Sequence, residues 1–330
     1  MLTSKVILQM KSLTRTQIEF LKENGYLVIE DAIGHNYLDA VIADLEHEID
    51  SRARELHETK ELSDLYAELP FATRLAKISQ ETPKLAVSIW NGILHSPGIF
   101  RLITAEPILD VMEDILGDEI IASSVYRLRP KIPNFGYGEV PWHQDSAYFE
   151  PYCDDILILT AWIPLVDADE DNGCMWVIPG SHKKPVVEHR SHETGKYLEI
   201  TDDSLPKDNW VCCPVRKGGM LLLTNKVMHA SFKNRTEGVR WSMDLRYQSA
   251  SAPTNADITR LEGEIDRSIE SDAPAACFPP EADFLVRSRK RADQVIDSYQ
   301  SFKHLRENYR GEAVTNRFNV QWKALREEEV

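Results

Sequence analysis

The sequence contains no run of about 18 apolar residues, so no segment has the length that a membrane-spanning helix needs. The first residues lack the long apolar core of a signal peptide. The last residues form neither a peroxisomal address nor a prenylation box. These absences predict a cytoplasmic protein that does not have a membrane as its partner.

Basic residues are scarce relative to acidic ones, because 38 Lys and Arg stand against 53 Asp and Glu and leave a net charge of −15. Nucleic acids and anionic membranes both bind through a basic face. The charge therefore argues against nucleic acid as a partner. The sequence does not indicate an oligomeric state.

Cysteine is also sparse, and the cysteines show no CxxC spacing. This excludes the common paired-thiol motifs that bind zinc or exchange disulfides. An odd number of cysteines without such spacing favours reduced thiols in a cytosolic protein. The five residues are Cys153, Cys174, Cys212, Cys213 and Cys277.

The first third of the chain has the signals of helices. Residues 13–25 predict a helix, with a capping box from Thr14 to Gln17 and a stop at Asn24-Gly25. A strand is predicted at 26–29 and a second helix at 37–52, where apolar residues recur at helical spacing. A third helix is predicted from Pro107 to Gly117.

From residue 120 onward the pattern is that of short strands separated by turn residues. The predicted strands are 120–129, 139–148, 156–165, 174–178, 211–215, 219–225, 227–233 and 239–248. Their number and spacing favour a double-sheet barrel or jelly roll. The polar stretch 183–210 predicts a lid-like insertion between strands, and helices are predicted at 255–270 and 288–310.

The length of 330 residues suits one large domain. We expect a single mainly β domain with flanking helices over residues 1–330. Residues 1–118 would form an N-terminal helical part with the first strand, and 119–250 the jelly-roll core. Residues 251–330 would form a C-terminal helical extension.

His143 and Asp145 stand two positions apart in one predicted strand. On a strand such residues project from the same face, so an imidazole and a carboxylate are aimed at one point. They would supply two of the three ligands of a 2-His-1-carboxylate site, which holds non-haem Fe(II) and keeps open positions. An HxD tripeptide also arises often by chance, so a second histidine and an anion anchor are needed elsewhere.

The stretch 239–247 alternates strictly between apolar and polar residues. The polar positions are Arg240, Ser242, Asp244 and Arg246, and the apolar ones are Val239, Trp241, Met243, Leu245 and Tyr247. Such a strand usually turns its polar face to water. In a small barrel with a polar pocket that face points inward and helices cover the apolar face, which the flanking helical segments favour.

A hairpin with its turn near residues 235–236 would place Ser231 roughly opposite Arg240. Because His229 shares a face with Ser231, all three side chains would then converge on one cavity. His229 would complete the metal site, and Arg240 is suited to hold a carboxylate through a bidentate, charge-assisted pair. Taken alone, His229 is typical of a core histidine and Arg240 of a surface salt bridge, but together they fit one mechanism.

These residues resemble the phytanoyl-CoA dioxygenase family, whose members are Fe(II)- and 2-oxoglutarate-dependent oxygenases on a double-stranded β-helix, a cupin-like jelly roll. The resemblance covers about residues 13–248. It rests on the His143-x-Asp145 pair, on His229, and on Arg240 eleven positions later. The segments 142–146, 161–165 and 178–182 also resemble the metal strand, a central strand and a turn of that family.

The resemblance implies His143, Asp145 and His229 as iron ligands, with 2-oxoglutarate and O2 as the other reactants. It implies Arg240 and Ser231 as binders of the distal 2-oxoglutarate carboxylate, and Gln144 and Trp162 as walls of that pocket. His182 is more typical of a structural turn and is left out of the metal set.

The residues that would contact substrate or cosubstrate are predicted from their nearness to the metal strand. They are Tyr126, Arg127, Arg129 and Tyr148.

Asp145 favours hydroxylation over halogenation, because related iron halogenases have a small residue at the carboxylate position. Desaturation, epoxidation and cyclisation use the same ligands and remain open. A different class also remains open, namely a barrel that binds a metal or a small acid without turnover.

Overall fold

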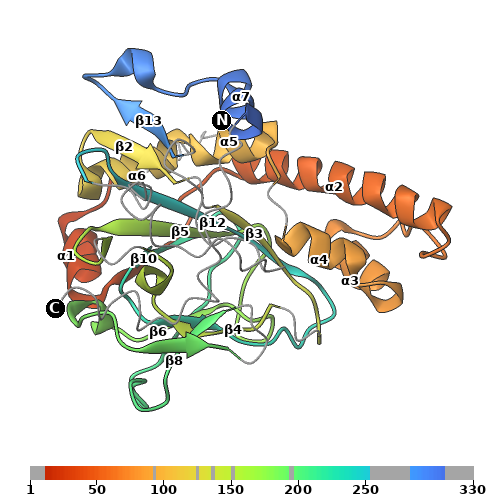
Figure 1. The fold of residues 1–330 in the computed structure, drawn as a ribbon, viewed down its shortest axis with the longest axis horizontal. Coiled ribbons are helices and arrows are strands. Elements are labelled where there is room, and N and C mark those ends of the chain that lie inside the picture. The colour runs from red at the N-terminus through yellow and green to blue at the C-terminus, as the bar shows by residue number, and fades with distance from the viewer. Residues whose placement is uncertain are drawn as a thin grey trace, which may run out of the picture.

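Two antiparallel sheets lie face to face at the centre of the structure (Figure 1). The computed structural model describes residues 12–91, 94–123, 126–134, 138–149, 153–192, 197–252 and 283–308. The larger sheet has seven strands in the order β1-β10-β5-β12-β2-β13, with β3 also paired to β12, and the smaller has four in the order β4-β11-β6-β9. In this described part the sheets form a sandwich rather than a closed barrel. The expected mainly β fold with a jelly-roll core is thus confirmed.

Most strands follow the predicted segments with shifts at their ends, but the predicted strand 120–129 corresponds to two strands, β2 and β3. The larger sheet contains β1 (Tyr26–Ile29), β2 (Glu119–Ala122), β3 (Arg127–Lys131), β5 (Ile158–Pro164), β10 (Met220–Thr224), β12 (Arg240–Ser249) and β13 (Phe284–Ser288). The smaller sheet contains β4 (Val140–His143), β6 (Met175–Val177), β9 (Val211–Cys213) and β11 (His229–Ser231). A separate hairpin of β7 (His189–Ser191) and β8 (Leu198–Ile200) lies in the 183–210 insertion.

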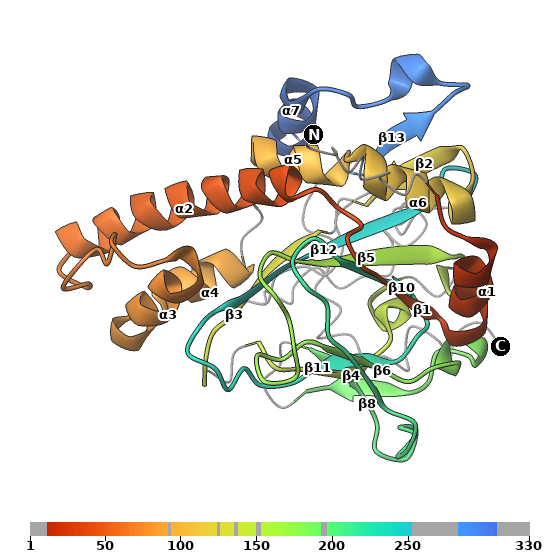
Figure 2. The ribbon, with the colours of Figure 1, turned by 180° about the vertical axis from the view of Figure 1, so that it is seen from behind.

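Helices cover the outer face of the larger sheet, and one pair of them extends past it as an arm (Figures 1 and 2). They are α1 (Arg15–Asn24), α2 (His35–Glu58), α3 (Phe71–Glu81), α4 (Lys84–Asn91), α5 (Pro97–Ile103), α6 (Glu106–Leu116) and α7 (Tyr299–Asn308). The far ends of α2 and α3 form the arm. The predicted helices at 13–25, 37–52 and 107–117 correspond to α1, α2 and α6.

The two faces of β12 are buried in different surroundings, as its alternating sequence predicts. Its apolar side chains belong to the main hydrophobic core together with residues of the covering helices. Trp241 stacks on Phe71 of α3 with ring centroids 5.0 Å apart, and the Tyr247 hydroxyl donates to the Ile103 carbonyl of α5 at 2.7 Å. The polar side chains Arg240, Asp244 and Arg246 instead line a cavity between the sheets. The inward arrangement is therefore correct.

The C-terminal segment differs from its prediction. Residues 284–288 add the edge strand β13 to β2, and the helix α7 begins only at Tyr299. Basic residues at this strand hold it against α6. Arg287 pairs with Asp110 and Glu113, and Arg289 pairs with Glu113. The predicted helix 255–270 lies outside the described residues.

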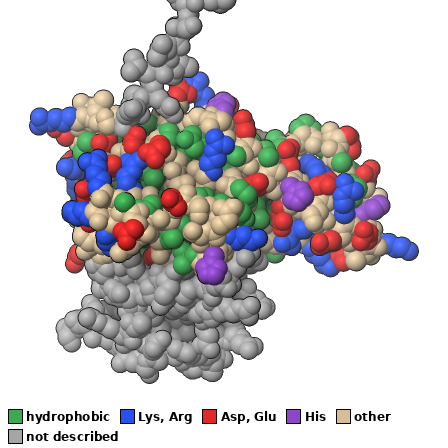
Figure 3. Space-filling view, turned by 90° about the horizontal axis from the view of Figure 1, so that it is seen from above, with side chains coloured by type: hydrophobic (Ala, Val, Ile, Leu, Met, Phe, Trp, Pro, Cys, Tyr) green, Lys and Arg blue, Asp and Glu red, His purple; other side chains and the backbone are tan. Residues whose placement is uncertain are grey.

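The surface carries mixed charge on the face seen in Figure 3, where acidic and basic side chains are interspersed over the described residues. A continuous basic surface of the kind that nucleic acid binds is not visible on this face of the described residues. No described helix combines the length and the apolar character that crossing a membrane requires.

Gly25 ends α1 and allows the turn at residues 179–182 to pack closely against the end of this helix. Its φ of 80° lies in the left-handed region, and its N–H donates to the Leu21 carbonyl at 2.7 Å. A Cβ at this position would collide with the ring of His182. That ring also hydrogen-bonds the Lys22 carbonyl through Nε2 at 3.1 Å. His182 therefore contacts the end of α1, in agreement with its omission from the metal set.

Replacing Gly25 by Ala should lower the free energy of unfolding by about 1–3 kcal/mol, because the side chain is strained at positive φ and meets His182. Urea denaturation followed by circular dichroism measures the change. Gly34→Ala is the matched control, since Gly34 has φ −61° and a Cβ there meets only the movable Asn36 side chain. Equal urea midpoints for the two variants would contradict this role of Gly25.

Candidate metal centre and its cavity

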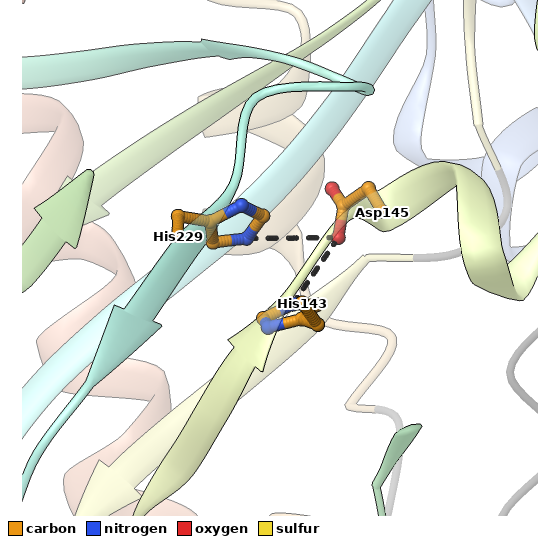
Figure 4. Close-up of side chains that lie close together, drawn as sticks. All are labelled: His143, Asp145 and His229. Atoms are coloured by element: carbon orange, nitrogen blue, oxygen red, sulfur yellow. Dashed lines mark ion pairs between the residues drawn. The ribbon is translucent and has the colours of Figure 1, made fainter. Parts of the chain in front are cut away.

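Three buried side chains meet between the sheets, as Figure 4 shows. His143 ends β4, His229 begins β11, and these two residues face each other directly across the pair of strands. Asp145 begins a 3-10 turn at Asp145–Tyr148. Its Oδ1 lies 3.7 Å from His143 Nε2 and 3.8 Å from His229 Nε2. One ligand atom from each residue falls within 4.8 Å of the others, so the set fits a divalent cation.

The local structure around Asp145 differs from the prediction of a strand over 139–148. The strand β4 ends at His143, and Asp145 belongs to the 3-10 turn. Gln144 between them keeps an extended backbone, with φ −115° and ψ 132°. The chain therefore stays extended from His143 through Gln144, and Asp145 projects to the same side as His143. The 3-10 turn starts at Asp145 itself. The predicted convergence holds although the predicted strand is too long.

Backbone carbonyls orient both imidazoles toward the cation position. His143 Nδ1 lies 2.8 Å from the Pro141 carbonyl, and His229 Nδ1 lies 2.9 Å from the Val227 carbonyl. Because a carbonyl only accepts, each Nδ1 carries the proton and each Nε2 offers its lone pair. Burial, followed by the neighbouring His143, lowers the pKa of His229 to about 4. His229 is thus neutral at neutral pH, the state that binds a metal.

The Asp145 carboxylate is held by two side chains that the sequence reasoning did not assign. Thr160 Oγ1 donates to Oδ2 at 2.8 Å, and Arg246 donates from Nε to Oδ2 at 3.1 Å and from Nη2 to Oδ1 at 3.2 Å. Burial acts to raise the pKa of Asp145, but Arg246 and the two histidines hold it well below its usual range. Asp145 is therefore ionised, with Oδ1 turned toward the imidazoles.

Arg240 lies in the same cavity and has only neutral hydrogen-bond partners among the described residues. Its Nη2 donates to Ser231 Oγ at 3.2 Å and its Nη1 to Ser242 Oγ at 2.5 Å, while its Nε is buried without a partner. The guanidinium lies 5.3 Å from the centre of the Trp162 ring. Burial lowers the pKa of Arg240 to about 10, so it is still cationic at neutral pH. An orphaned donor on a buried cation fits a carboxylate ligand.

The predicted hairpin between the strands of His229 and Arg240 does not form. The strand β11 pairs with β4 and β6 in the smaller sheet, whereas β12 pairs with β2, β3 and β5 in the larger one. Ser231 and Arg240 meet because the two sheets face each other. The segment 233–238 between β11 and β12 therefore crosses from the smaller sheet to the larger one, although its sequence is typical of a hairpin turn.

Four other predicted residues are not among those that line the cavity. Gln144 donates to the Lys226 carbonyl at 2.8 Å and accepts from the Val187 N–H at 2.9 Å. The Tyr148 hydroxyl accepts from the Leu198 N–H at 2.8 Å, and the Tyr126 hydroxyl bonds His95 Nδ1 at 2.5 Å. Arg127 is buried and contacts the Tyr126 carbonyl. Direct contact of these four with cosubstrate or substrate stays a prediction.

The cavity contains further residues to which the sequence assigned no role. Besides the three residues of the metal cluster and Arg240, its walls include Trp90, Asp244, Met175 and Leu223. Arg129, which was predicted to contact substrate or cosubstrate, also lines it. Asp244 and Arg246 had a signal, since they belong to the polar face of the alternating strand. Thr160 had none, because nothing local in its sequence marks it. Trp90 lies in a stretch where the sequence allows a pocket wall but is more typical of a buried structural tryptophan.

Comparisons with known proteins give a consistent picture. The profile of the family "Phytanoyl-CoA dioxygenase (PhyH)" matches residues 21–242. Phytanoyl-CoA dioxygenase domain-containing protein 1 of Mus musculus is 32% identical over 165 residues, which are 48% of this chain and 55% of that protein. A probable alpha-ketoglutarate-dependent hypophosphite dioxygenase of Stutzerimonas stutzeri is 34% identical over 135 residues, or 41% and 44% of the two chains. The match thus spans about half the length of these relatives.

One solved structure shares the fold over nearly the whole chain. The non-heme monooxygenase ThoJ in its apo form superposes with a TM-score of 0.52 and 18% identity, over 94% of this chain and 98% of that one. At this identity the likeness shows the fold.

Removing the donors to Asp145 should weaken metal binding. We expect Arg246→Met and Thr160→Val each to raise the Kd for Co(II) by about 10–100-fold, because the carboxylate loses the partners that orient it. Calorimetric titration of the metal-free protein measures this without any turnover. The matched control is Arg216→Met, whose side chain is 74% exposed. If Arg246→Met binds Co(II) as tightly as the control, the contact of Arg246 with Asp145 has no role in metal binding.

Proposed function

We propose, since this chain belongs to the phytanoyl-CoA dioxygenase family, that it hydroxylates an unactivated C–H bond of a small-molecule metabolite with Fe(II), 2-oxoglutarate and O2. The observation that carries the proposal is the meeting of two anchors in one cavity. The first is the cluster of His143, Asp145 and His229. The second is Arg240, whose hydrogen-bond partners among the described residues are all neutral.

The chain's residues divide the work by position. His143 and His229 would hold iron through Nε2 and Asp145 through Oδ1. Arg240 and Ser231 would hold the distal carboxylate of 2-oxoglutarate, with Trp162 as a wall. Iron, when bound, supplies the activation of O2 that couples conversion of 2-oxoglutarate to succinate and CO2 with oxygen transfer to the substrate.

The protein's own contribution is orientation and exclusion of water. The side chains of His143, Asp145 and His229 are at most 8% exposed, so bulk water has little access to the reacting centre. The charge of the cavity is set before the reactants arrive, because the polar groups are fixed by hydrogen bonds from the strands. The pose of the two bound reactants is then determined by the protein.

The position of Asp145 supports hydroxylation over halogenation. The carboxylate occupies the ligand position, and Thr160 and Arg246 hold it there. In a halide site a small residue would stand in place of this carboxylate and leave the coordination position open. Desaturation, epoxidation and cyclisation would need the same three ligands, so product analysis distinguishes them from hydroxylation.

Turnover of 2-oxoglutarate should depend on the metal and on its ligands. We expect purified protein with added Fe(II) to release succinate, and we expect chelation of the metal or His143→Ala to reduce the rate by at least about 100-fold. Mass spectrometry of a metabolite panel would show a gain of one oxygen. A protein that binds Fe(II) but forms no succinate with any compound would be a non-catalytic metal-binding barrel.

The cosubstrate should depend on the fork of Arg240. Arg240→Gln is expected to raise the KM for 2-oxoglutarate by about 10–100-fold, because a charge-assisted pair with the distal carboxylate is lost. Arg240→Lys keeps the charge without the forked pair of donors, so its KM for 2-oxoglutarate should lie between those of the wild type and Arg240→Gln. The dependence of succinate formation on 2-oxoglutarate concentration gives these values. An unchanged KM in Arg240→Gln would place the distal carboxylate elsewhere.

A further inference from the structure

Arg129 and Asp244 form an ion pair in the wall of the cavity that neither the metal ligands nor the cosubstrate anchor uses. Arg129 lies on β3 and Asp244 on β12, which are neighbouring strands of the larger sheet. Arg129 Nε donates to Asp244 Oδ2 at 3.2 Å, and both side chains keep some exposure, 22% and 14%. Both residues line the same cavity as the metal cluster.

Arg129 is held in a way that leaves one edge of its guanidinium for a ligand. Its face lies over the Trp90 ring, with 4.9 Å between the guanidinium carbon and the ring centroid. Its Nε is used by Asp244, while Nη1 and Nη2 have no hydrogen-bond partner among the described residues. The ring and the ion pair fix the plane of the group, so the Nη1 and Nη2 amino groups form a preorganised fork for an anion.

Asp244, in contrast to Arg129, needs a hydrogen-bond donor. Its Oδ1 is buried and has no hydrogen-bond partner among the described residues, while Oδ2 accepts from Arg129. A buried carboxylate oxygen without a donor is costly, so a donor from a ligand would stabilise it. The dianion of 2-oxoglutarate has two carboxylates and a keto group, all of which accept. Of the two organic reactants, only the substrate can therefore supply the donor.

The charge of the cavity limits that reactant further. Its walls carry three guanidinium groups, from Arg129, Arg240 and Arg246, and two carboxylates, from Asp145 and Asp244. The balance of 3 − 2 is +1, and Fe(II) with the dianion of 2-oxoglutarate adds 2 − 2, or zero. A cationic compound is thus disfavoured, and an anion or a zwitterion is favoured.

We propose that Arg129 and Asp244 bind the head group of the substrate, and that this head group is a carboxylate beside a hydroxyl or ammonium donor, as in an amino or hydroxy acid. The carboxylate pairs with the free edge of Arg129, and the donor pairs with Asp244 Oδ1. This inference rests on the proposed function for the reaction and adds the substrate class. The apolar walls at Val140, Met175 and Leu223 remain for the carbon skeleton.

Binding can be measured separately from turnover. The protein is loaded with Fe(II) and 2-oxoglutarate without oxygen and titrated calorimetrically with small amino and hydroxy acids. Each acid is compared with its amide, which lacks the carboxylate, and with its deaminated or deoxy analogue, which lacks the donor. We expect the tightest ligand to carry both groups and each analogue to bind at least about tenfold more weakly, the loss of one charge-assisted hydrogen bond.

Variants assign each group to its partner. Arg129→Gln should bind the acid at least about tenfold more weakly and no longer prefer it to the amide. Asp244→Asn should lose the preference for the donor-bearing ligand. Arg129→Lys keeps the cation without the fork and serves where Arg129→Gln does not fold. Arg216→Gln, at a 74% exposed position, is the control and should bind like the wild type.

Three results would overturn the proposal. Wild-type protein could bind the amides as tightly as the acids, or bind none of the acids. Alternatively, Arg129→Gln could weaken 2-oxoglutarate binding as much as acid binding, which would assign Arg129 to the cosubstrate. Failure of the proposed function has a different signature, since the acids would then still bind selectively while no succinate forms with oxygen present.

Discussion

Burial of charge between two sheets is the constraint on which this site depends. A buried carboxylate or guanidinium is stable only with partners that replace water. Asp145 has Arg246 and Thr160, Arg240 has two serine hydroxyls, and Arg129 has Asp244. The contacts of Asp145 and the Arg240–Ser231 bond join the two sides of the cavity, whereas the Arg129–Asp244 pair lies within the larger sheet. The same contacts that make the charges tolerable also fix the directions in which the unused donors and acceptors point.

The insertion between β6 and β9 is tied to this arrangement through the backbone beside the metal ligands. The N–H of Gln144 donates to His189 Nε2 at 3.1 Å, and its side chain accepts from the Val187 N–H. The ring of Tyr148 packs edge-on against His143, with centroids 5.7 Å apart, and its hydroxyl bonds Leu198. A shift of the insertion would therefore act directly on the segment that carries His143 and Asp145. These contacts with the insertion are separate from the pocket wall predicted for Gln144 and the substrate contact predicted for Tyr148, both of which stay predictions.

Sequence reasoning located the ligands because their signals are local or periodic. His143-x-Asp145 and the alternating polar row of β12 can be read directly, and α1 is marked by its capping box. The pairing of strands could not be read in this way, since a turn-like segment such as 233–238 serves a hairpin and a crossing equally well. Thr160 lies in the apolar run Ile158–Pro164, and its role exists only because β5 lies beside β12 opposite Asp145. Trp90 likewise reaches Arg129 only through the packing of α4 on β3.

The strand β12 carries Arg240, Asp244 and Arg246 at alternate positions of one row. Arg240 is the proposed cosubstrate anchor, Asp244 the proposed acceptor for the head group, and Arg246 the partner of Asp145. Its other row lies beneath the helices. A deletion of one residue inside this strand would exchange the two rows. Arginines would then face the apolar core while Trp241 and Leu245 faced the reactants. Changes of specificity that involve β12 must therefore arise by substitution within the row, because a one-residue change in the length of the strand would disturb binding, chemistry and folding together.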